Sequence, residues 1–307
     1  MEKVIVVIGP TSVGKTKMGV ALAKKFNGEV ISGDSMQIYK QMDIGTAKVT
    51  EEEKEGIIHH CVDILNPDET YSVHDFQQTV RKQLTEIISR GHVPIIVGGT
   101  GLYIKAALYD YTFSEMENNH DEIYEKYKDY TNEQLYDYLK QIDEESAKIL
   151  HFNNRRRVLR AIEIYEQTGQ KKSEIINEQE HICLYDAYFV GLTLPRDVLY
   201  ERINKRVDVM MENGLKEEMD CLYSQGLTRN HQSMKAIGYK EWFDYYDHQI
   251  DLNDVLELIK KHSRQYAKRQ YTWFKNQFDV HWYDVNLENF EQTIEQVTDD
   301  IEKILKV

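Results

Sequence analysis

The sequence has little cysteine, no long hydrophobic run and no low-complexity tract. Its three cysteines, Cys61, Cys183 and Cys221, are odd in number and far apart, which excludes a disulfide framework and a C-x-x-C metal site. The longest apolar run has only the length of a strand, which excludes a transmembrane helix. The N-terminus enters a strand pattern directly, without a secretion signal. We therefore expect a globular cytoplasmic protein without a membrane partner, and by default a monomer.

Positive charge is also scarce, since the formal net charge is −14. Such a balance argues against a nucleic-acid partner, but the charge is unevenly distributed. Residues 111–150 contain four lysines and eleven acidic residues, which accounts for half of the net negative charge. Four arginines fall within residues 155–160, and residues 260–275 contain six Lys or Arg and no acid. Local basic patches matter more than the total charge when the partner is a polyanion.

A phosphate-binding pattern begins at Gly9. Residues 9–16 match G-x-x-x-x-G-K-[ST], after the apolar run 4–8 and before a helical pattern. This order of strand, glycine loop and helix is the context that a P-loop requires. Lys15 should reach terminal phosphates and the Thr16 hydroxyl should hold Mg²⁺. The sequence therefore predicts a di- or triphosphate site formed by Gly9, Pro10, Thr11, Ser12, Val13, Gly14, Lys15 and Thr16.

Two further strands are predicted to end beside this loop. Residues 29–33 and 94–97 have strand character, and the residues that follow include Asp34 and Thr100. Ligands of open α/β sheets bind at the carboxyl ends of the strands, so both side chains are candidates for the site. Asp34 could instead form only an Asx-turn or a helix cap, and Thr100 only a helix N-cap. A long loop over the site is expected at residues 38–48, and another short strand at residues 62–65.

The middle of the chain has a different character. Residues 111–186 are rich in Tyr, Asn and acidic residues and show helical stretches without a strand pattern, whereas residues 188–194 return to strand character. The predicted fold is therefore α/β, a P-loop NTPase-like parallel sheet flanked by helices, with an all-helical insertion domain. The first part of the core spans residues 1–110 and the insertion spans 111–186. Residues 187–307 complete the core and add C-terminal helices.

Several basic residues have two open interpretations. Arg156, Arg157 and Arg160 lie on one arc of a predicted helix, which suits either a solvated face or nucleic-acid phosphates. Arg206 lies at the border of an apolar stripe, where it could snorkel or reach a phosphate. Residues 260–275 interleave Lys268 and Arg269 with Tyr266, Tyr271 and Trp273. This pattern suits RNA contact, although the aromatic rings could equally be core.

Taken together, several stretches resemble the bacterial tRNA dimethylallyltransferase (isopentenyltransferase) family. They run nearly end to end and in order. The stretches are residues 9–16, 32–35, 38–40, 42–48 and 97–100, Arg157 with Arg160, and residues 236–240 and 268–270. A P-loop alone would be unspecific, whereas its combination with Asp34-Ser35 and residues 42–48 is highly specific.

The resemblance implies transfer of a dimethylallyl group from dimethylallyl diphosphate to N6 of adenosine 37 in tRNA. The P-loop would then bind the diphosphate donor with Mg²⁺ rather than ATP. Asp34 would be the general base, Thr100 would contact the diphosphate near the breaking bond, and Arg206 would clamp its phosphates. The residues implied to bind tRNA, at the anticodon stem-loop, are Asp34, Ser35, Met36, Gln37, Arg156, Arg157, Arg160, Lys268 and Arg269. The C-terminal zinc finger of many eukaryotic relatives has no counterpart in this sequence.

Two other functions compete with this one. A P-loop kinase of a small metabolite or nucleotide would share the fold, with the arginines of residues 155–160 serving as a lid. A nucleotide-switched RNA-binding protein would need no general base, so it would not require Asp34. The sequence does not separate Arg202 from Arg206. It also does not explain the acidic, tyrosine-rich face of the insertion, which carries Tyr124, Tyr127, Tyr130, Tyr136 and Tyr138.

Overall fold

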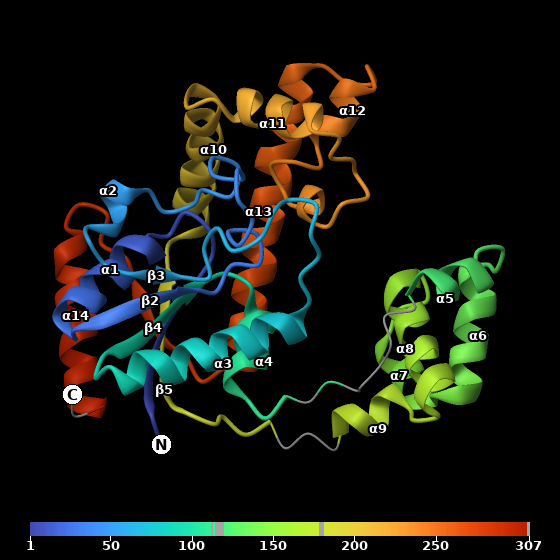
Figure 1. The fold of residues 1–307 in the computed structure, drawn as a ribbon, viewed down its shortest axis with the longest axis horizontal. Helices are drawn as coiled ribbons and strands as arrows, with labels where there is room; N and C mark the ends of the chain where they lie inside the picture. The colour runs from blue at the N-terminus through green and yellow to red at the C-terminus, as the bar shows by residue number, and fades with distance from the viewer. Residues whose placement is uncertain (112, 114–119, 178–180, 306–307) are drawn as a thin grey trace. The chain divides into compact units, whose positions relative to one another are not determined.

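The computed structural model describes residues 1–111, 113, 120–177 and 181–305. The chain separates into two compact units. One combines Met1–Tyr109 with Cys183–Val307, and the other is Asp110–Ile182. Each unit is described by itself below (Figure 1).

A parallel sheet forms the centre of the first unit. Within the described residues it has six strands in the order β3-β2-β4-β1-β5-β6, and every neighbouring pair is parallel. Because all strands run the same way, their carboxyl ends share one edge of the sheet, where ligands of α/β folds bind. The strands are β1 (Lys3–Ile8), β2 (Gly28–Ser32), β3 (His59–His60), β4 (Val93–Gly98), β5 (Asp186–Thr193) and β6 (His281–Asp284).

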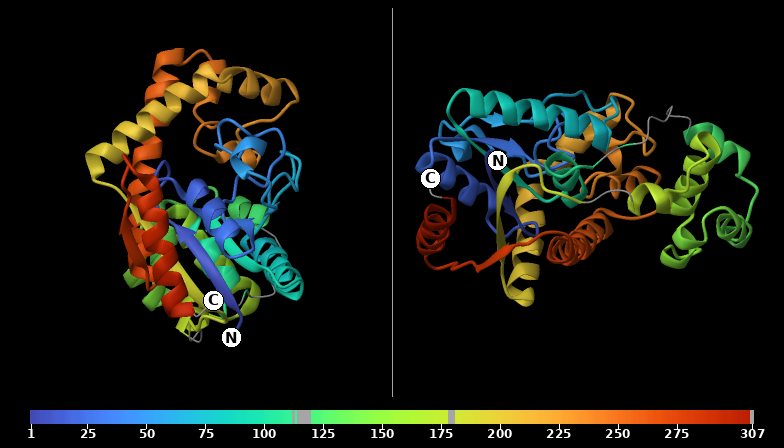
Figure 2. Two further views of the ribbon diagram at one scale, coloured as in Figure 1. Left: turned by 90° about the vertical axis from the view of Figure 1, so that its left-hand side faces the viewer. Right: turned by 90° about the horizontal axis from the view of Figure 1, so that it is seen from below.

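Helices cover both faces of this sheet, which explains why its strands are apolar throughout rather than alternating. On one face, Val6 and Ile8 of β1 pack with residues of α3 (Val73–Ser89) and α4 (Gly101–Leu108). On the other, Ile5 and Val7 pack with residues of α1 (Lys15–Lys25), α10 (Arg196–Glu212) and α14 (Phe290–Leu305). Figure 2 shows α14 and α3 on opposite sides of the strands. The predicted α/β fold is confirmed.

Further helices extend the first unit beyond the sheet. Capping boxes begin three of its helices where the sequence favours them, with Thr50 and Glu53 at α2, Ser72 and Asp75 at α3, and Asp251 and Asp254 at α13. The remaining elements are α2 (Glu51–Lys54), α11 (Leu215–Ser224), the 3₁₀ helix η1 (Ser233–Lys235), α12 (Trp242–Tyr246) and α13 (Leu252–Gln277).

The second unit is helical over its described residues. Leu135, Leu139, Val158, Leu159 and Ile162 form its apolar core. The buried carboxylate of Asp143 caps α7 and also accepts hydrogen bonds from the Ser173 amide and hydroxyl, which joins α7 to α9. The helices are α5 (His120–Lys126), α6 (Asn132–Ile142), α7 (Glu144–Ile149), α8 (Arg155–Thr168) and α9 (Lys172–Asn177).

One predicted strand is wrong. Residues 62–65 form bends rather than a strand, with an isolated bridge from Leu65 to Tyr39, and the third strand lies earlier, at His59–His60. Cys61 and Asp63 adopt φ values of 60° and 55°, a left-handed conformation that interrupts a strand. The loop predicted at residues 38–48 is present.

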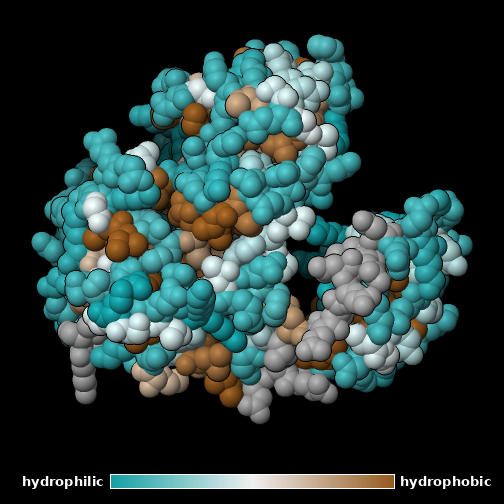
Figure 3. Space-filling view, viewed as in Figure 1, coloured by the Kyte–Doolittle hydropathy of each residue, from teal (hydrophilic) through white to brown (hydrophobic). Residues whose placement is uncertain are grey.

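The visible surface in Figure 3 is mostly hydrophilic, with a few gathered hydrophobic areas. None of the helices in the described part of the chain combines the length and the apolar composition needed to cross a membrane.

Candidate active site

The P-loop connects β1 to α1 at the carboxyl edge of the sheet. Ser12 and Gly14 adopt positive φ values of 67° and 105°, so the backbone curls as a phosphate-binding loop requires. The Lys15 ammonium donates a hydrogen bond to the Pro10 carbonyl at 2.7 Å. Burial, together with the nearby Arg206 charge, lowers the pKa of Lys15 to about 7. The loop therefore holds a desolvated cation that an incoming phosphate would stabilise in its charged form.

Asp34 follows β2 directly and lies in the electrostatic field of this lysine. Burial raises the pKa of the Asp34 carboxyl above its usual value, against opposing effects of the Met36 amide, Lys15 and Arg206. Its Oδ1 accepts a hydrogen bond from the Met36 amide at 2.9 Å. The Asx-turn considered from sequence is thus real, and the half-buried carboxyl lies at the same sheet edge as the phosphate loop.

Thr100 joins the ends of two strands. Its Oγ1 accepts a hydrogen bond from the Ser35 amide at 3.1 Å and lies 3.4 Å from the Ser35 hydroxyl. It makes no side-chain capping bond to α4, although it occupies the N-cap position. The structure therefore decides against a simple N-cap role. The hydroxyl of Thr100 instead packs against the turn that carries Asp34.

Arginines from α10 reach the P-loop on its other side. Arg206 Nη1 lies 3.5 Å from Thr11 Oγ1, and burial lowers the pKa of this guanidinium. Arg202, which is exposed, donates from Nε to the Ser12 carbonyl at 3.0 Å. The two arginines, which sequence did not separate, therefore differ. Arg202 supports the loop backbone, whereas Arg206 is the more buried cation beside Lys15.

Helix α13 supplies site residues whose contacts the sequence did not reveal. Gln270 accepts a hydrogen bond from the Thr11 amide at 3.1 Å and donates to the Gly99 carbonyl at 2.9 Å. The Tyr266 hydroxyl also contacts the Gly99 carbonyl, at 3.3 Å. Burial and the Asp34 charge raise the pKa of Tyr266 to about 12. In the sequence, the i, i+4 spacing of Tyr266 and Gln270 indicates that both side chains lie on one face of a basic helix. The spacing does not indicate which loop this face contacts.

The two basic residues predicted on α13 remain accessible. Lys268 and Arg269 are exposed, and the Arg269 guanidinium lies 5.7 Å from the centre of the Tyr266 ring. Two other cations of the same helix have partners within the protein. Lys260 pairs with Asp208, and Arg264 contacts Asn204. Lys268 and Arg269 are therefore the better placed of these cations for an external polyanion.

The P-loop offers hydroxyl groups as ligands for a magnesium ion. No group of three or more His, Cys, Asp or Glu side chains gathers as a metal site within the described ranges. Mg²⁺ bound with a diphosphate needs only one or two protein ligands, because phosphate oxygens and waters complete its shell. Thr16 is half-buried in the first turn of α1, and the Ser12 hydroxyl in the same loop is buried without a hydrogen-bond partner. These hydroxyls fit an ion carried in with the phosphates.

The arginines of α8 belong to the second unit and divide into two kinds. Arg155 donates to the Tyr127 and Tyr130 carbonyls, both at 2.6 Å, so it supports the fold of the insertion. Arg156 and Arg157 are exposed, and Arg160 pairs with Glu163 at 2.8 Å. The sequence did not single out Lys172 as a neighbour of these arginines. Burial and the charges of Arg157 and Arg160 lower its pKa, so this lysine of α9 lies near those two arginines.

The geometry thus brings the P-loop, Asp34–Gln37, Thr100 and Arg206 to one edge of the first unit. Arg156, Arg157 and Arg160 lie in the second unit. The roles given to these residues from sequence stay predictions.

Known proteins resemble the chain over nearly its whole length. A family model described as IPP transferase matches residues 37–277. A tRNA dimethylallyltransferase of Bacillus cereus is 53% identical over 289 residues, which cover 92% of this chain and 90% of the relative. A tRNA dimethylallyltransferase of Bacillus anthracis has the same identity over 92% of this chain and 91% of its own length.

Solved structures of related transferases are also similar to this chain. The crystal structure of a tRNA delta(2)-isopentenylpyrophosphate transferase from Staphylococcus epidermidis is 46% identical, with a TM-score of 0.74 and 99% of both chains covered. A eukaryotic dimethylallyltransferase acting on tRNA is 33% identical with a TM-score of 0.86, and the match covers 99% of this chain and 79% of that one.

Proposed function

Because this chain belongs to the IPP transferase family, we propose that it is a tRNA dimethylallyltransferase. It transfers the dimethylallyl group of dimethylallyl diphosphate to N6 of adenosine 37 in tRNA. The observation that carries this proposal is the half-buried Asp34 carboxyl, which follows β2 at the P-loop edge of the sheet, accepts a hydrogen bond from the Met36 amide and lies in the field of Lys15. One site thereby offers a diphosphate cradle and a general base.

The base acts on the acceptor. The exocyclic amine of adenine is a weak nucleophile, and its proton must leave as the new C–N bond forms. A carboxylate within hydrogen-bond reach of N6 orients the amine and accepts that proton, which is typically worth about 10²–10⁴-fold in rate. Asp34 has a pKa raised by burial, which makes it a stronger base than an exposed carboxylate. The adenine must leave the anticodon stack to reach it, as other base-modifying enzymes require.

The P-loop acts on the leaving group. When the C–O bond of the donor breaks, the departing diphosphate gains negative charge. Lys15, Arg206 and the loop amides stabilise this charge in a partly desolvated setting. Mg²⁺ held by Thr16 and the phosphates would supply further neutralising charge to the diphosphate. Thr100, whose hydroxyl contacts the turn that carries Asp34, would contact the diphosphate near the bond that breaks.

Exposed cations on each unit would bind the RNA. Lys268 and Arg269 on α13, and Arg156, Arg157 and Arg160 on α8, suit the phosphates of an anticodon stem-loop. The turn of Asp34, Ser35, Met36 and Gln37 would meet the target base. Such local patches account for RNA binding by a protein whose formal net charge is −14.

We further propose that the protein acts in the cytoplasm as a monomer. The three cysteines are free, as expected in a reducing compartment. The kinase alternative would require a nucleoside triphosphate donor and a small hydroxyl acceptor. The near end-to-end relationship to tRNA dimethylallyltransferases argues against that function.

A transfer assay tests the proposed function. Purified protein and Mg²⁺ are incubated with labelled dimethylallyl diphosphate and an anticodon stem-loop that carries adenosine or guanosine immediately 3′ of the anticodon. Label on the adenosine RNA alone is expected. Absence of label together with phosphate transfer from ATP to a small acceptor would replace this function with a kinase.

A further inference from the structure

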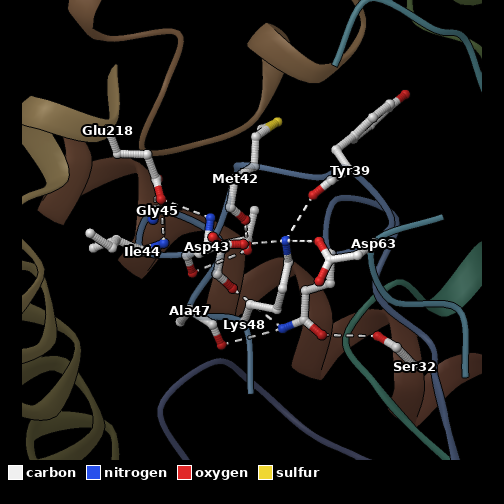
Figure 4. A network of polar contacts seen from close by, with 12 residues as sticks. Ser32, Tyr39, Met42, Asp43, Ile44, Gly45, Ala47, Lys48, Asp63 and Glu218 are labelled. Atoms are coloured by element: carbon white, nitrogen blue, oxygen red, sulfur yellow. Dashed lines mark hydrogen bonds and ion pairs between the residues drawn. The ribbon is translucent and has the colours of Figure 1, made fainter. Parts of the chain in front are cut away.

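A carboxylate outside the reaction site binds the backbone of the loop at residues 43–47. Glu218 of α11 accepts three consecutive backbone hydrogen bonds, from the amides of Asp43 at 2.8 Å, Ile44 at 2.7 Å and Gly45 at 3.0 Å (Figure 4). Three N–H groups converging on one point form an anion-binding nest. Here the anion is supplied by the protein itself, 173 to 175 residues further along the chain.

A second segment encloses the same loop. The Tyr239 hydroxyl donates to Glu218 Oε1 at 2.6 Å. Burial and the Glu218 charge raise the pKa of Tyr239 well above its usual value, so the hydroxyl remains a donor. A side chain on Gly45 would meet the Tyr239 ring at 2.5 Å. The loop therefore fits between α11 and residue 239 only with glycine at position 45.

From this loop, contacts lead to the turn of the general base. The Gln37 side-chain amide donates to the carbonyls of Thr46 and Ala47, both at 3.4 Å, and its Oε1 accepts from the Ser32 hydroxyl at 2.9 Å. Ser32 ends β2, and Gln37 closes the four-residue stretch that begins with Asp34. The orientation of Gln37 thus depends on where residues 46 and 47 lie.

The other end of the loop is tied down independently. The Lys48 ammonium is buried and binds the Tyr39 carbonyl at 2.8 Å and the carboxylates of Asp43 and Asp63. Figure 4 shows this ammonium at the centre of its three partners. Because Lys48 anchors the loop base without Glu218, removal of Glu218 would loosen residues 43–47 without unfolding the segment.

We propose that Glu218 is a positioning residue of the transfer reaction, acting through the 43–47 loop and Gln37 on the RNA side of the site. The inference rests on the proposed function. Glu218 contacts the loop and Tyr239, whereas the P-loop is held by α10 and α13. Glu218 therefore supports the RNA side of the site, whereas residues of α10 and α13 support the donor side.

The test compares Glu218→Gln with Glu217→Gln, which alters an exposed carboxylate on the same helix. Glutamine has one acceptor oxygen in place of two and cannot serve all the donors that converge on Glu218. We expect Glu218→Gln to raise the KM for the stem-loop and to lower kcat/KM for it by about 10- to 100-fold. The KM for dimethylallyl diphosphate should not change, and Glu217→Gln should behave as the wild type.

A double-mutant cycle that combines Glu218→Gln with Gln37→Ala tests whether Glu218 acts through Gln37. If Glu218 acts through Gln37, the double variant is no worse than Gln37→Ala alone, since coupled residues are not additive. Additive losses, an equal rise in both KM values, or a fall in kcat with both KM values unchanged would overturn the proposal. The last pattern would indicate only a smaller folded fraction.

Amide hydrogen exchange tests the role of Glu218 independently of the proposed transfer activity. Residues 43–47 should exchange faster in Glu218→Gln than in the wild type, whereas the P-loop should not. Unchanged exchange would refute the support of the loop by Glu218 whatever the activity. Faster exchange in a protein that transfers no dimethylallyl group would instead refute the proposed function.

Discussion

Gln270 connects the phosphate loop to the neighbouring glycine turn through one side chain, because it accepts from the Thr11 amide and donates to the Gly99 carbonyl. The side chain is buried, so both bonds lie away from water, where an unmade bond is costly. A residue 259 positions away in sequence therefore orders the loop that follows the first strand.

The first prediction concerns this connection. Gln270→Glu keeps an acceptor for the Thr11 amide, but it loses the donor to Gly99 and adds a negative charge beside the phosphate loop. We expect the dissociation constant for dimethylallyl diphosphate to rise about tenfold or more, as measured by calorimetry. Gln265→Glu, on the exposed side of the same helix, should leave it unchanged. Equal affinities for wild type and Gln270→Glu would show that the connection does not support the donor site.

The second prediction separates activity from stability at Asp34. Asp34→Asn should lower transfer by about 10²–10⁴-fold without weakening donor binding. Burial raises the pKa of Asp34 in the folded protein, so folding favours its protonated form. Stability is therefore lost as pH rises from the ordinary carboxyl range through the raised pKa. The melting temperature of Asp34→Asn should consequently exceed that of the wild type at neutral pH and approach it in acid.

The control for this experiment is Asp68→Asn, at an exposed site, which should change neither property. In the wild type, transfer should fall as pH drops through the raised pKa of Asp34, because the base becomes protonated. Transfer that survives Asp34→Asn would leave the enzyme class intact and remove Asp34 as the base.

The third prediction uses the Lys15 pKa of about 7. The free lysine is largely uncharged above this pH, whereas a bound diphosphate favours its charged form, so binding should take up a proton. Donor affinity should therefore fall as pH rises above about 7. Calorimetry in two buffers with different protonation enthalpies measures the uptake directly. Lys15→Met should weaken binding and abolish the uptake, whereas Lys17→Met, at an exposed neighbour, should retain it. Binding that is independent of pH in the wild type would contradict the assignment.

The fourth prediction distinguishes arginines on α8. Arg157→Ala should weaken binding of the stem-loop and reduce the slope of log affinity against log salt by about 1. Arg155→Ala should chiefly lower the melting temperature, because this guanidinium holds the Tyr127 and Tyr130 carbonyls. Lys140→Ala, in the same unit and paired with Asp137, serves as the charge-matched control. A salt slope unchanged in Arg157→Ala would place the RNA elsewhere.

The fifth prediction concerns Glu29 of β2, whose carboxylate is buried. It contacts Arg90 Nη2 at 2.8 Å and both His60 Nε2 and His92 Nδ1 at 2.6 Å. Despite burial, these hydrogen bonds lower the pKa of Glu29 to about 2. Its stabilising contribution is thus present above the ordinary carboxyl pKa and is lost as pH falls through about 2.

We expect Glu29→Gln to lower the free energy of unfolding by about 2 kcal/mol at neutral pH, as measured by chemical denaturation, and to leave transfer unchanged. The difference from the wild type should shrink toward pH 2. Glu86→Gln removes a half-buried carboxylate of α3 that pairs with Lys82, and it should have little effect. A loss in Glu29→Gln that persists in acid would indicate a packing defect rather than a lost ionic contact.

The sequence by itself determined the elements whose signals are local. The P-loop has a fixed spacing between its glycines and its lysine, and the buried strands are apolar on both faces. Each can therefore be recognised within about ten residues. The placement of Asp34 and Thr100 at one sheet edge also followed, because parallel strands end together. The strand predicted at residues 62–65 was wrong, because Cys61 and Asp63 adopt left-handed backbone conformations. The hydrophobic periodicity of the sequence does not reveal such conformations.

The tertiary structure alone decided which distant side chains contact the loops around the site. Gln270 meets Thr11, Arg202 meets the Ser12 carbonyl, and Glu218 meets the amides of residues 43–45. These pairs are separated by 173 to 259 residues, so no periodicity of the sequence relates them. Burial likewise exists only after folding. It raises the pKa of Asp34, as a general base requires, and it lowers the pKa of Lys15, whose charged form a bound diphosphate would favour again. Sequence specifies which groups are available, whereas packing decides which of them are desolvated and what they contact.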